Sequence, residues 1–183
     1  MKKILLLLII VAPTILVRAQ FEKAELQASG LTCSMCSNAI QKALKTLPFV
    51  ETVQTDLNKN LFTLAFKKDV AVDFDQIKNK VEGAGFSVAD LWITANLHGV
   101  QVNDDAHTSL GGMNFHFMHV KPATLDGKYR LQVIDKNFVL SKEYKKFSAY
   151  TVMPCYKTGI MQACCKSKDE SLASSERIYH VTL

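Results

Sequence analysis

The chain has 183 residues, of which 48% are hydrophobic and 21% are charged, and its formal net charge at pH 7 is +5. This length supports one large hydrophobic core or two small ones. Only eight glycines and four prolines are present, which argues against a long disordered stalk. The lysines are scattered and are not interleaved with aromatic residues along one stripe, so we expect no binding to nucleic acid.

The first 19 residues have the pattern of a secretory signal peptide. A positive start, Met-Lys-Lys, precedes an apolar run over residues 4–17, and small residues lead to a cleavage point after Ala19. The apolar run is too short to span a membrane readily. The alternative is that the segment is not cleaved and anchors the protein in the membrane. We therefore expect a periplasmic or secreted protein with no membrane span after cleavage. Cleavage would lower the formal charge to about +2.

Residues 20–94 show alternating strand and helix patterns. Apolar residues repeat at helical spacing after residue 36, and Asp73 followed by Gln76 has the pattern of a helix N-terminal cap. Alternating apolar residues predict the strands, and Asn58-Lys59-Asn60 predicts a turn between two of them. The expected order is βαββαβ, with strands near 24–28, 50–57, 62–66 and 86–94. This order predicts an α+β fold of the ferredoxin-like type.

Two cysteines, Cys33 and Cys36, lie between the first strand and the first helix. At a helix start, unpaired N–H groups and the helix dipole favour a thiolate, which binds metals or attacks disulfides. The CxxC spacing therefore has three interpretations: a soft-metal site, the redox pair of a thiol–disulfide oxidoreductase, or a structural disulfide. Two thiolates suit Cu(I) better than Zn(II), because Zn(II) takes about four ligands.

The sequence GLTCSMC at residues 30–36 and the sequence GAGF at residues 83–86 resemble the heavy-metal-associated domain. That family includes copper chaperones, the N-terminal domains of copper-transporting ATPases and a periplasmic mercury-binding protein. The resemblance implies that Cys33 and Cys36 hold Cu(I), with Hg(II), Ag(I) and Zn(II) as alternatives. It also implies that Thr32 and Phe86 support the metal loop. A metal-transporting membrane protein or another metal carrier is the implied partner.

Residues 95–183 resemble no family that we recognise. They show strand-like runs and little helical periodicity, which predicts a small, mainly β domain, either a barrel or a sandwich. The expected strands cover residues 92–102, 113–120, 129–133, 138–140, 147–153 and 178–183.

A histidine and a methionine in this second half, His116 and Met118, have the spacing of neighbours on one face of a strand. We expect them to point outward with Asn114, and the opposite face, with Met113, Phe115, Phe117 and His119, to point inward. Imidazole and thioether both suit copper, so His116 and Met118 are a candidate half of a copper site. The alternative is an ordinary half-exposed strand.

Three further cysteines, Cys155, Cys164 and Cys165, lie close together near Met153 and Met161. In an oxidising compartment we expect a disulfide from Cys155 to Cys164 or to Cys165, which leaves one thiol over. A second soft-metal site is the alternative.

The sequence as a whole predicts an exported soft-metal-ion binding protein rather than an enzyme. It carries or sequesters metal, most simply Cu(I), through Cys33 and Cys36. The alternative function is a thiol–disulfide oxidoreductase that uses the same pair.

Overall fold

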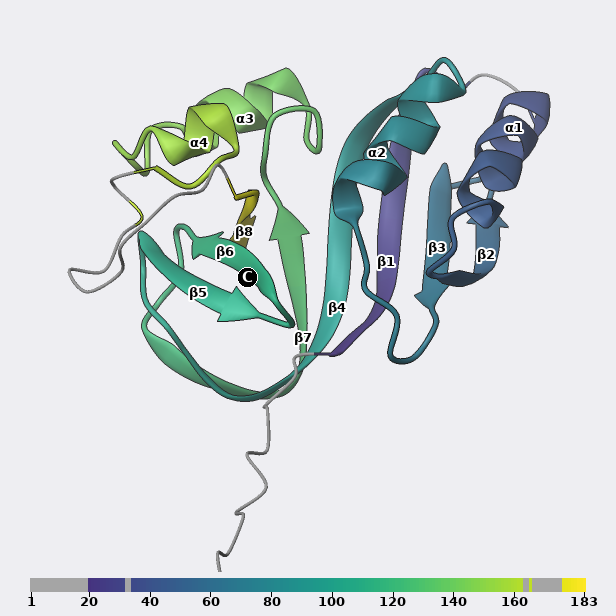
Figure 1. Cartoon of the computed structure of the whole chain (residues 1–183). Coiled ribbons are helices and arrows are strands. Elements are labelled where there is room, and N and C mark those ends of the chain that lie inside the picture. Colours follow the sequence, from purple (N-terminus) through teal and green to yellow (C-terminus); the bar gives the residue numbers. More distant parts are fainter. Residues whose placement is uncertain (1–19, 32–33, 163–164, 166–175) are drawn as a thin grey trace, which may run out of the picture.

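The computed structural model describes residues 20–183 apart from 32–33, 163–164 and 166–175, so the predicted signal peptide lies outside the described residues. The first half contains β1 (Gln20–Ser29), α1 (Ser34–Lys45), β2 (Val50–Asp56), β3 (Leu61–Phe66), α2 (Phe74–Gly83) and β4 (Ser87–Val102). The strand order is β2-β3-β1-β4 and both helices lie on one face of this sheet (Figure 1). The predicted ferredoxin-like βαββαβ order is therefore confirmed.

The core of this half follows the apolar periodicity of the sequence. Strand β1 buries Ala24, Leu26 and Ala28 and leaves the alternate residues Glu25 and Gln27 partly or fully exposed, while β3 buries every second side chain. Helix α2 buries Phe74, Ile77 and Val81 against the sheet. The carboxylate of Asp73 accepts a hydrogen bond from the Gln76 backbone N–H at 3.1 Å, so the predicted helix cap is present.

Strand β4 is 16 residues long and joins the two halves of the chain. One edge pairs with β1 through residues 87–96, and the other edge pairs with β7 (Ala123–Val133) through residues 92–102. The pairing with β7 shifts register between Leu97 and Val100, beside Gly99 with its positive φ of 63°. The predicted domain boundary at residues 94/95 therefore falls inside a continuous strand.

The second half adds β5 (Ala106–Leu110), β6 (Met113–Phe117), β7, α3 (Ser141–Phe147), α4 (Cys155–Thr158) and β8 (Ile178–Thr182). Its strands continue the first sheet in the order β4-β7-β8-β6-β5, which makes one sheet of eight strands. The second half therefore shares a sheet with the first half through the long β4, and the described strands do not form the two-sheet sandwich that was one possibility for residues 95–183.

Two predicted strands in the second half are wrong as well. Residues 138–140 form a loop with one isolated bridge at Val139, and residues 147–153 follow the end of α3 without forming a strand. The segment Ser141–Phe147 is helical, and it places Phe147 and the ring of Tyr144 against Tyr156 of α4 and its neighbours. Figure 1 shows α3 and α4 together over the curved part of the sheet formed by β5 to β8.

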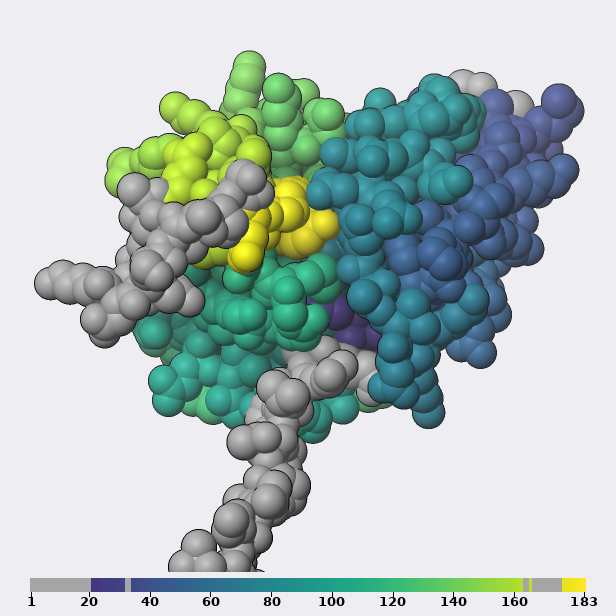
Figure 2. All heavy atoms as spheres, viewed as in Figure 1, coloured from purple at the N-terminus to yellow at the C-terminus, as the bar shows by residue number. Residues whose placement is uncertain are grey.

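Strand β8 and the residue before it tie the second half to α2. Arg177 Nε donates to Asp75 at 2.7 Å, and the Tyr179 hydroxyl lies 3.2 Å from the same carboxylate. The Tyr179 ring also meets Phe74 edge-on, with 5.1 Å between the ring centres. In the space-filling view, the yellow β8 segment fills the space between the two halves (Figure 2). Within the described residues, no helix has the length and apolar character needed to cross a membrane.

Candidate metal centre

The predicted metal loop leaves β1 through Gly30, whose φ of +82° is a conformation that favours glycine. A Cβ atom at Gly30 would lie 3.9 Å from the Phe86 ring, so Phe86 lies directly beside the start of the loop. Leu31 and Phe86 are both partly buried and pack against the main core. Phe86 is thus placed where it can support the loop, and Thr32 lies outside the described residues.

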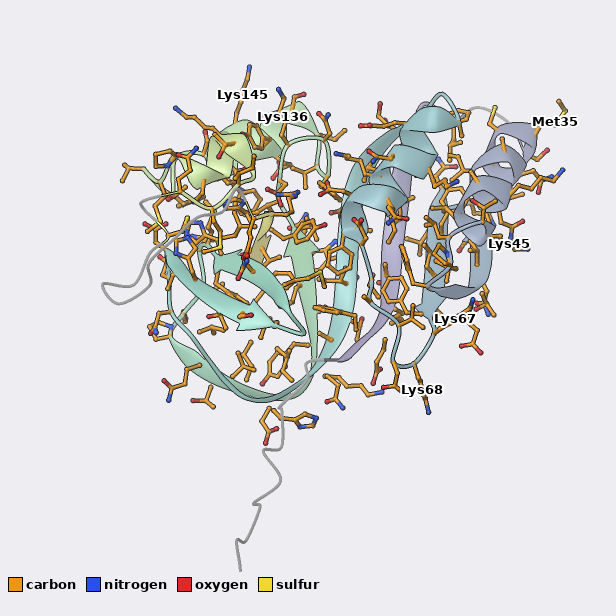
Figure 3. The ribbon with its side chains drawn as sticks, viewed as in Figure 1. Met35, Lys45, Lys67, Lys68, Lys136 and Lys145 are labelled. Carbon is orange, nitrogen blue, oxygen red and sulfur yellow. The ribbon has the colours of Figure 1, made fainter. Side chains whose placement is uncertain are left out.

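Cys36 lies in the first turn of α1 and is partly buried. That turn holds no acidic residue, so its unpaired N–H groups and the helix dipole act on the sulfur without a competing carboxylate. Met35 beside it is 79% exposed and projects outward from the end of α1 (Figure 3). The second predicted ligand, Cys33, lies outside the described residues. The described end of the loop therefore places a partly buried cysteine in the first turn of a helix.

Comparison with known proteins agrees with this geometry. The family model of the heavy-metal-associated domain matches residues 25–87. The copper chaperone CopZ of Staphylococcus haemolyticus is 30% identical over 63 residues, which is 34% of this chain and 91% of the chaperone. The chain belongs to the heavy-metal-associated domain family.

One relative is much longer than this chain. The probable copper-transporting ATPase HMA5 of Arabidopsis thaliana is 32% identical over 80 residues, which is 44% of this chain but 8% of the ATPase. The solved structure of the yeast copper transporter domain Ccc2a is 31% identical, and the match covers 36% of this chain and 88% of that domain, with a TM-score of 0.32. The family model falls in the first half of the chain.

The residues proposed for a second site do not lie on the expected faces. His116 and Met118 are both fully buried rather than exposed, because α4 and the loops around it cover the second face of β6. Phe115 and Phe117 point into the main core as predicted. His119, expected inward, is exposed. It has a positive φ of 56° and stacks on a tyrosine ring beyond α3.

His116 and Met118 also have different surroundings. Met118 packs among apolar side chains with Ile134 and Phe147, whereas His116 faces the sulfur of Cys155. The predicted pairing of imidazole with thioether at these two positions is therefore wrong.

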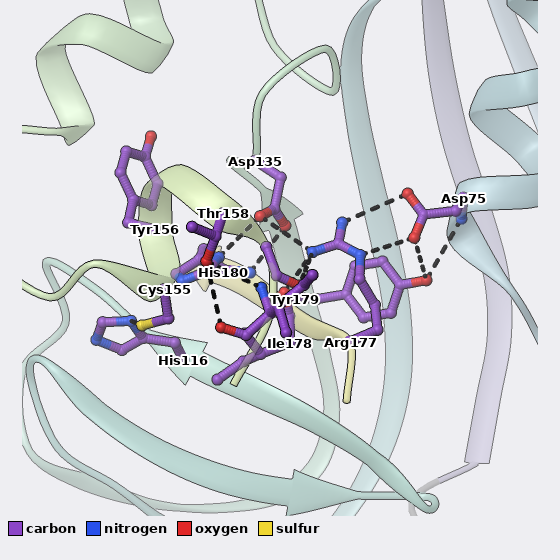
Figure 4. A network of polar contacts seen from close by, with 12 residues as sticks. Asp75, His116, Asp135, Cys155, Tyr156, Thr158, Arg177, Ile178, Tyr179 and His180 are labelled. Carbon is purple, nitrogen blue, oxygen red and sulfur yellow. Dashed lines mark hydrogen bonds and ion pairs between the residues drawn. The ribbon is translucent and has the colours of Figure 1, made fainter. Parts of the chain in front are cut away.

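A group of metal-binding side chains instead gathers around Cys155. Its Sγ lies 3.8 Å from His107 Nε2 and 3.9 Å from His116 Nδ1, and one ligand atom from each of the three lies within 4.8 Å of the others. Figure 4 shows the Cys155 sulfur against the His116 ring. We call His107, His116 and Cys155 the His–Cys cluster.

The register of the β5–β6 hairpin explains why His107 belongs to this cluster. His107 pairs directly with His116 across the two strands, and their ring centres are 4.5 Å apart. The sequence carried a signal for this pairing, because Gly111-Gly112 is a two-residue turn between alternating segments. Counting back from that turn would have placed His107 opposite His116.

Electrostatics keep the imidazole of His116 neutral. Burial, together with the nearby His180 and His107, lowers the pKa of His116 to about 4, against the opposing effect of Asp105. Burial lowers the pKa of His107 as well. The Asp105 carboxylate lies 2.9 Å from His116 Nε2, so a neutral ring donates its proton there. The lone pair of Nδ1 then faces Cys155.

The remaining predicted cysteines lie near the same place. Cys165 is buried beside Cys155 and Ile178, with Met153 and Met161 packed against them. Cys164 lies outside the described residues, so the predicted disulfide from Cys155 to Cys164 or Cys165 stays a prediction.

Proposed function

We propose that this protein is an exported carrier of soft metal ions and that it binds Cu(I) between Cys33 and Cys36. The observation that carries the proposal is the position of Cys36 in the first turn of α1. The match to a copper chaperone, which covers 91% of the chaperone's length, supports it. Two thiolates supply the soft ligands that Cu(I) prefers. A metal with only two protein ligands also leaves room for an incoming thiolate, which suits transfer to a partner.

The partner in this proposal is a metal-transporting membrane protein or another metal carrier. Support comes from the copper-transporting ATPases among the relatives, although this chain spans only 8% of the length of HMA5. The exposed Met35 beside Cys36 adds a thioether at the loop where the ion would be exchanged. The signal-peptide pattern of residues 1–19 supports export to the periplasm or the exterior.

The first test is an anaerobic titration of the reduced protein with Cu(I) against a chromophoric competing ligand. We expect one tightly bound Cu(I) per chain to be lost in the Cys33→Ser/Cys36→Ser variant and retained in a Ser34→Ala control. Ser34 lies in the same loop and carries no sulfur. Loss of binding in both variants, or no change in either, would contradict the proposal.

The alternative function, thiol–disulfide oxidoreduction, makes a different prediction for the same variants. It requires turnover of a disulfide substrate that depends on both Cys33 and Cys36, without tight Cu(I) binding.

The same competition assay compares mercury, silver and zinc ions with Cu(I). We expect Zn(II) to bind most weakly because the loop supplies only two thiolates. Mass spectrometry of the exported protein tests cleavage after Ala19.

A further inference from the structure

The His–Cys cluster lies in the second half of the chain, outside the residues matched to the heavy-metal-associated domain. Its three residues come from three separate elements: His107 from β5, His116 from β6 and Cys155 from the start of α4. His116 and Cys155 are fully buried and His107 is partly exposed. The cluster therefore has a closed interior with one member that reaches the surface.

We propose that the His–Cys cluster is a second metal site, in which two imidazoles and one thiolate hold a copper ion in a trigonal arrangement. This inference is independent of the proposed function of Cys33 and Cys36, because it rests on different residues in a different part of the fold.

The spacing of the ligand atoms fits a single ion. The sulfur of Cys155 is 3.8 Å from one imidazole nitrogen and 3.9 Å from the other. With bonds of about 2.3 Å to sulfur and about 2.0–2.1 Å to nitrogen, these separations correspond to angles of roughly 120–130° at the ion. Both angles are compatible with trigonal coordination, and the ligand atoms of the two histidines lie within 4.8 Å of each other.

The surroundings of His116 have the organisation of a metal ligand. Histidines that bind metals usually donate the proton of their second nitrogen to a carboxylate, which holds the ring in one orientation. Asp105 is that carboxylate here, at 2.9 Å from Nε2, and the opposite nitrogen faces Cys155. His116 is therefore oriented so that Nδ1 can bind an ion beside the sulfur.

A second observation comes from His180, whose ring centre is 5.0 Å from that of His116. His180 is fully buried, its Nδ1 is held by Asp135 at 2.7 Å, and its Nε2 has no hydrogen-bond partner among the described residues. Buried polar atoms rarely lack a hydrogen-bond partner. A bound ion that carries a water molecule would supply this nitrogen with a partner.

The donor set favours copper over other ions. A thiolate with two imidazoles in a trigonal plane is a copper-binding arrangement, and a distant thioether commonly accompanies it. Two thioethers, Met153 and Met161, pack against the group of side chains that contains Cys155. Zn(II) prefers four tetrahedral ligands, which this cluster does not supply from protein side chains in the described residues.

A catalytic interpretation of the same residues is less favourable. The contacts run from Cys155 to His116 and from His116 to Asp105, as they do between a nucleophile, a general base and an orienting carboxylate. However, Cys155 and His116 are fully buried, so the sulfur is not presented to a substrate at the surface. His107 is partly exposed, so the cluster reaches the surface at that residue.

The test uses the reduced Cys33→Ser/Cys36→Ser variant, in which the first site is removed. We expect this variant to retain one Cu(I) per chain in anaerobic titration against a competing ligand. X-ray absorption of the bound copper should show one sulfur and two nitrogen neighbours. A variant that retains no Cu(I), or that binds Zn(II) but not Cu(I), would overturn the assignment.

Further substitutions in that background identify the ligands. Cys155→Ser and His107→Gln should remove tight binding, whereas Asp105→Asn should weaken it about 10–100-fold, as expected for loss of an orienting carboxylate. His107 is partly exposed, so His107→Gln is the substitution least disruptive to folding, and circular dichroism checks that the fold is retained. The control is His98→Gln, an exposed histidine away from the cluster, which should leave binding unchanged.

Two results would overturn the ligand assignment even if copper binds. One is copper retained unchanged in folded His107→Gln and Cys155→Ser variants. The other is binding that depends on Cys165 and not on the two histidines, as tested by Cys165→Ser. The Cys33 and Cys36 site can fail its own titration without affecting either outcome, because that site is absent from this background.

Discussion

Arg177 holds the two halves of the protein together, and its replacement by methionine should cost substantial stability. The guanidinium lies 2.7 Å from Asp75 of α2 and 3.4 Å from Asp135, which is only 3% exposed. In the Arg177→Met variant, Asp135 keeps its hydrogen bonds from His180, and Asp75 keeps Lys78 at 3.3 Å. The remaining partners limit the loss to the lower end of the range for a broken buried ion pair, about 3 kcal/mol of unfolding free energy.

Thermal and urea unfolding of the purified protein measure this loss. A cost of about 3 kcal/mol corresponds to a midpoint lower by about 6–12 °C in a protein of this size. The matched control is Arg130→Met, which removes an exposed pair with Glu25 at 2.6 Å and should cost at most about 1 kcal/mol. If Arg177→Met destabilises the protein no more than Arg130→Met does, the reasoning about the buried pair is wrong.

Three other substitutions or conditions test the same fold. Burial raises the pKa of Asp75, but the hydrogen bond and charge of Arg177 outweigh it and hold that pKa below its usual range. The ion pair of Asp75 with Arg177 therefore contributes fully to stability above about pH 4, and this contribution is lost as the pH falls further. In urea unfolding, the difference in unfolding free energy between wild type and Arg177→Met should become smaller below about pH 4. A difference that stays constant with pH would contradict this. Gly159→Ala should cost about 1–3 kcal/mol in thermal unfolding, because φ is +68° there and the new Cβ would lie 2.8 Å from the guanidinium of Arg177. The control is Gly83→Ala, whose new Cβ meets nothing within 4 Å and which should be nearly neutral. Asp73→Ala removes the α2 cap and should cost about 1 kcal/mol in urea unfolding, and an unchanged midpoint would show that the cap is not stabilising.

The first half of the fold was predictable because its signals are local. Helical spacing, strand alternation and the cap at Asp73 each involve residues close together in the chain, and each identifies an element without knowledge of its neighbours. The CxxC loop followed from the same elements, because Cys33 and Cys36 lie where the first strand passes into the first helix.

The second half was predicted less well because its decisive contacts are distant in sequence. Alternation identified Phe115 and Phe117 as core residues, but it could not show that α4 covers the other face of β6 and buries His116. The sequence also did not show how the strands of the second half pair with those of the first. Nothing local shows that one strand, β4, has a second edge that carries β7.

The amino-acid sequence by itself determined the element order of the first half, its core residues and the place of Cys36 at the start of the first helix, since short-range periodicity and turn chemistry suffice for these. Only the tertiary structure decided that the sheet is continuous, that Arg177 joins the start of β8 to α2, and that Cys155 lies against His107 and His116. Each of these depends on contacts between residues tens of positions apart, and no local pattern encodes such contacts.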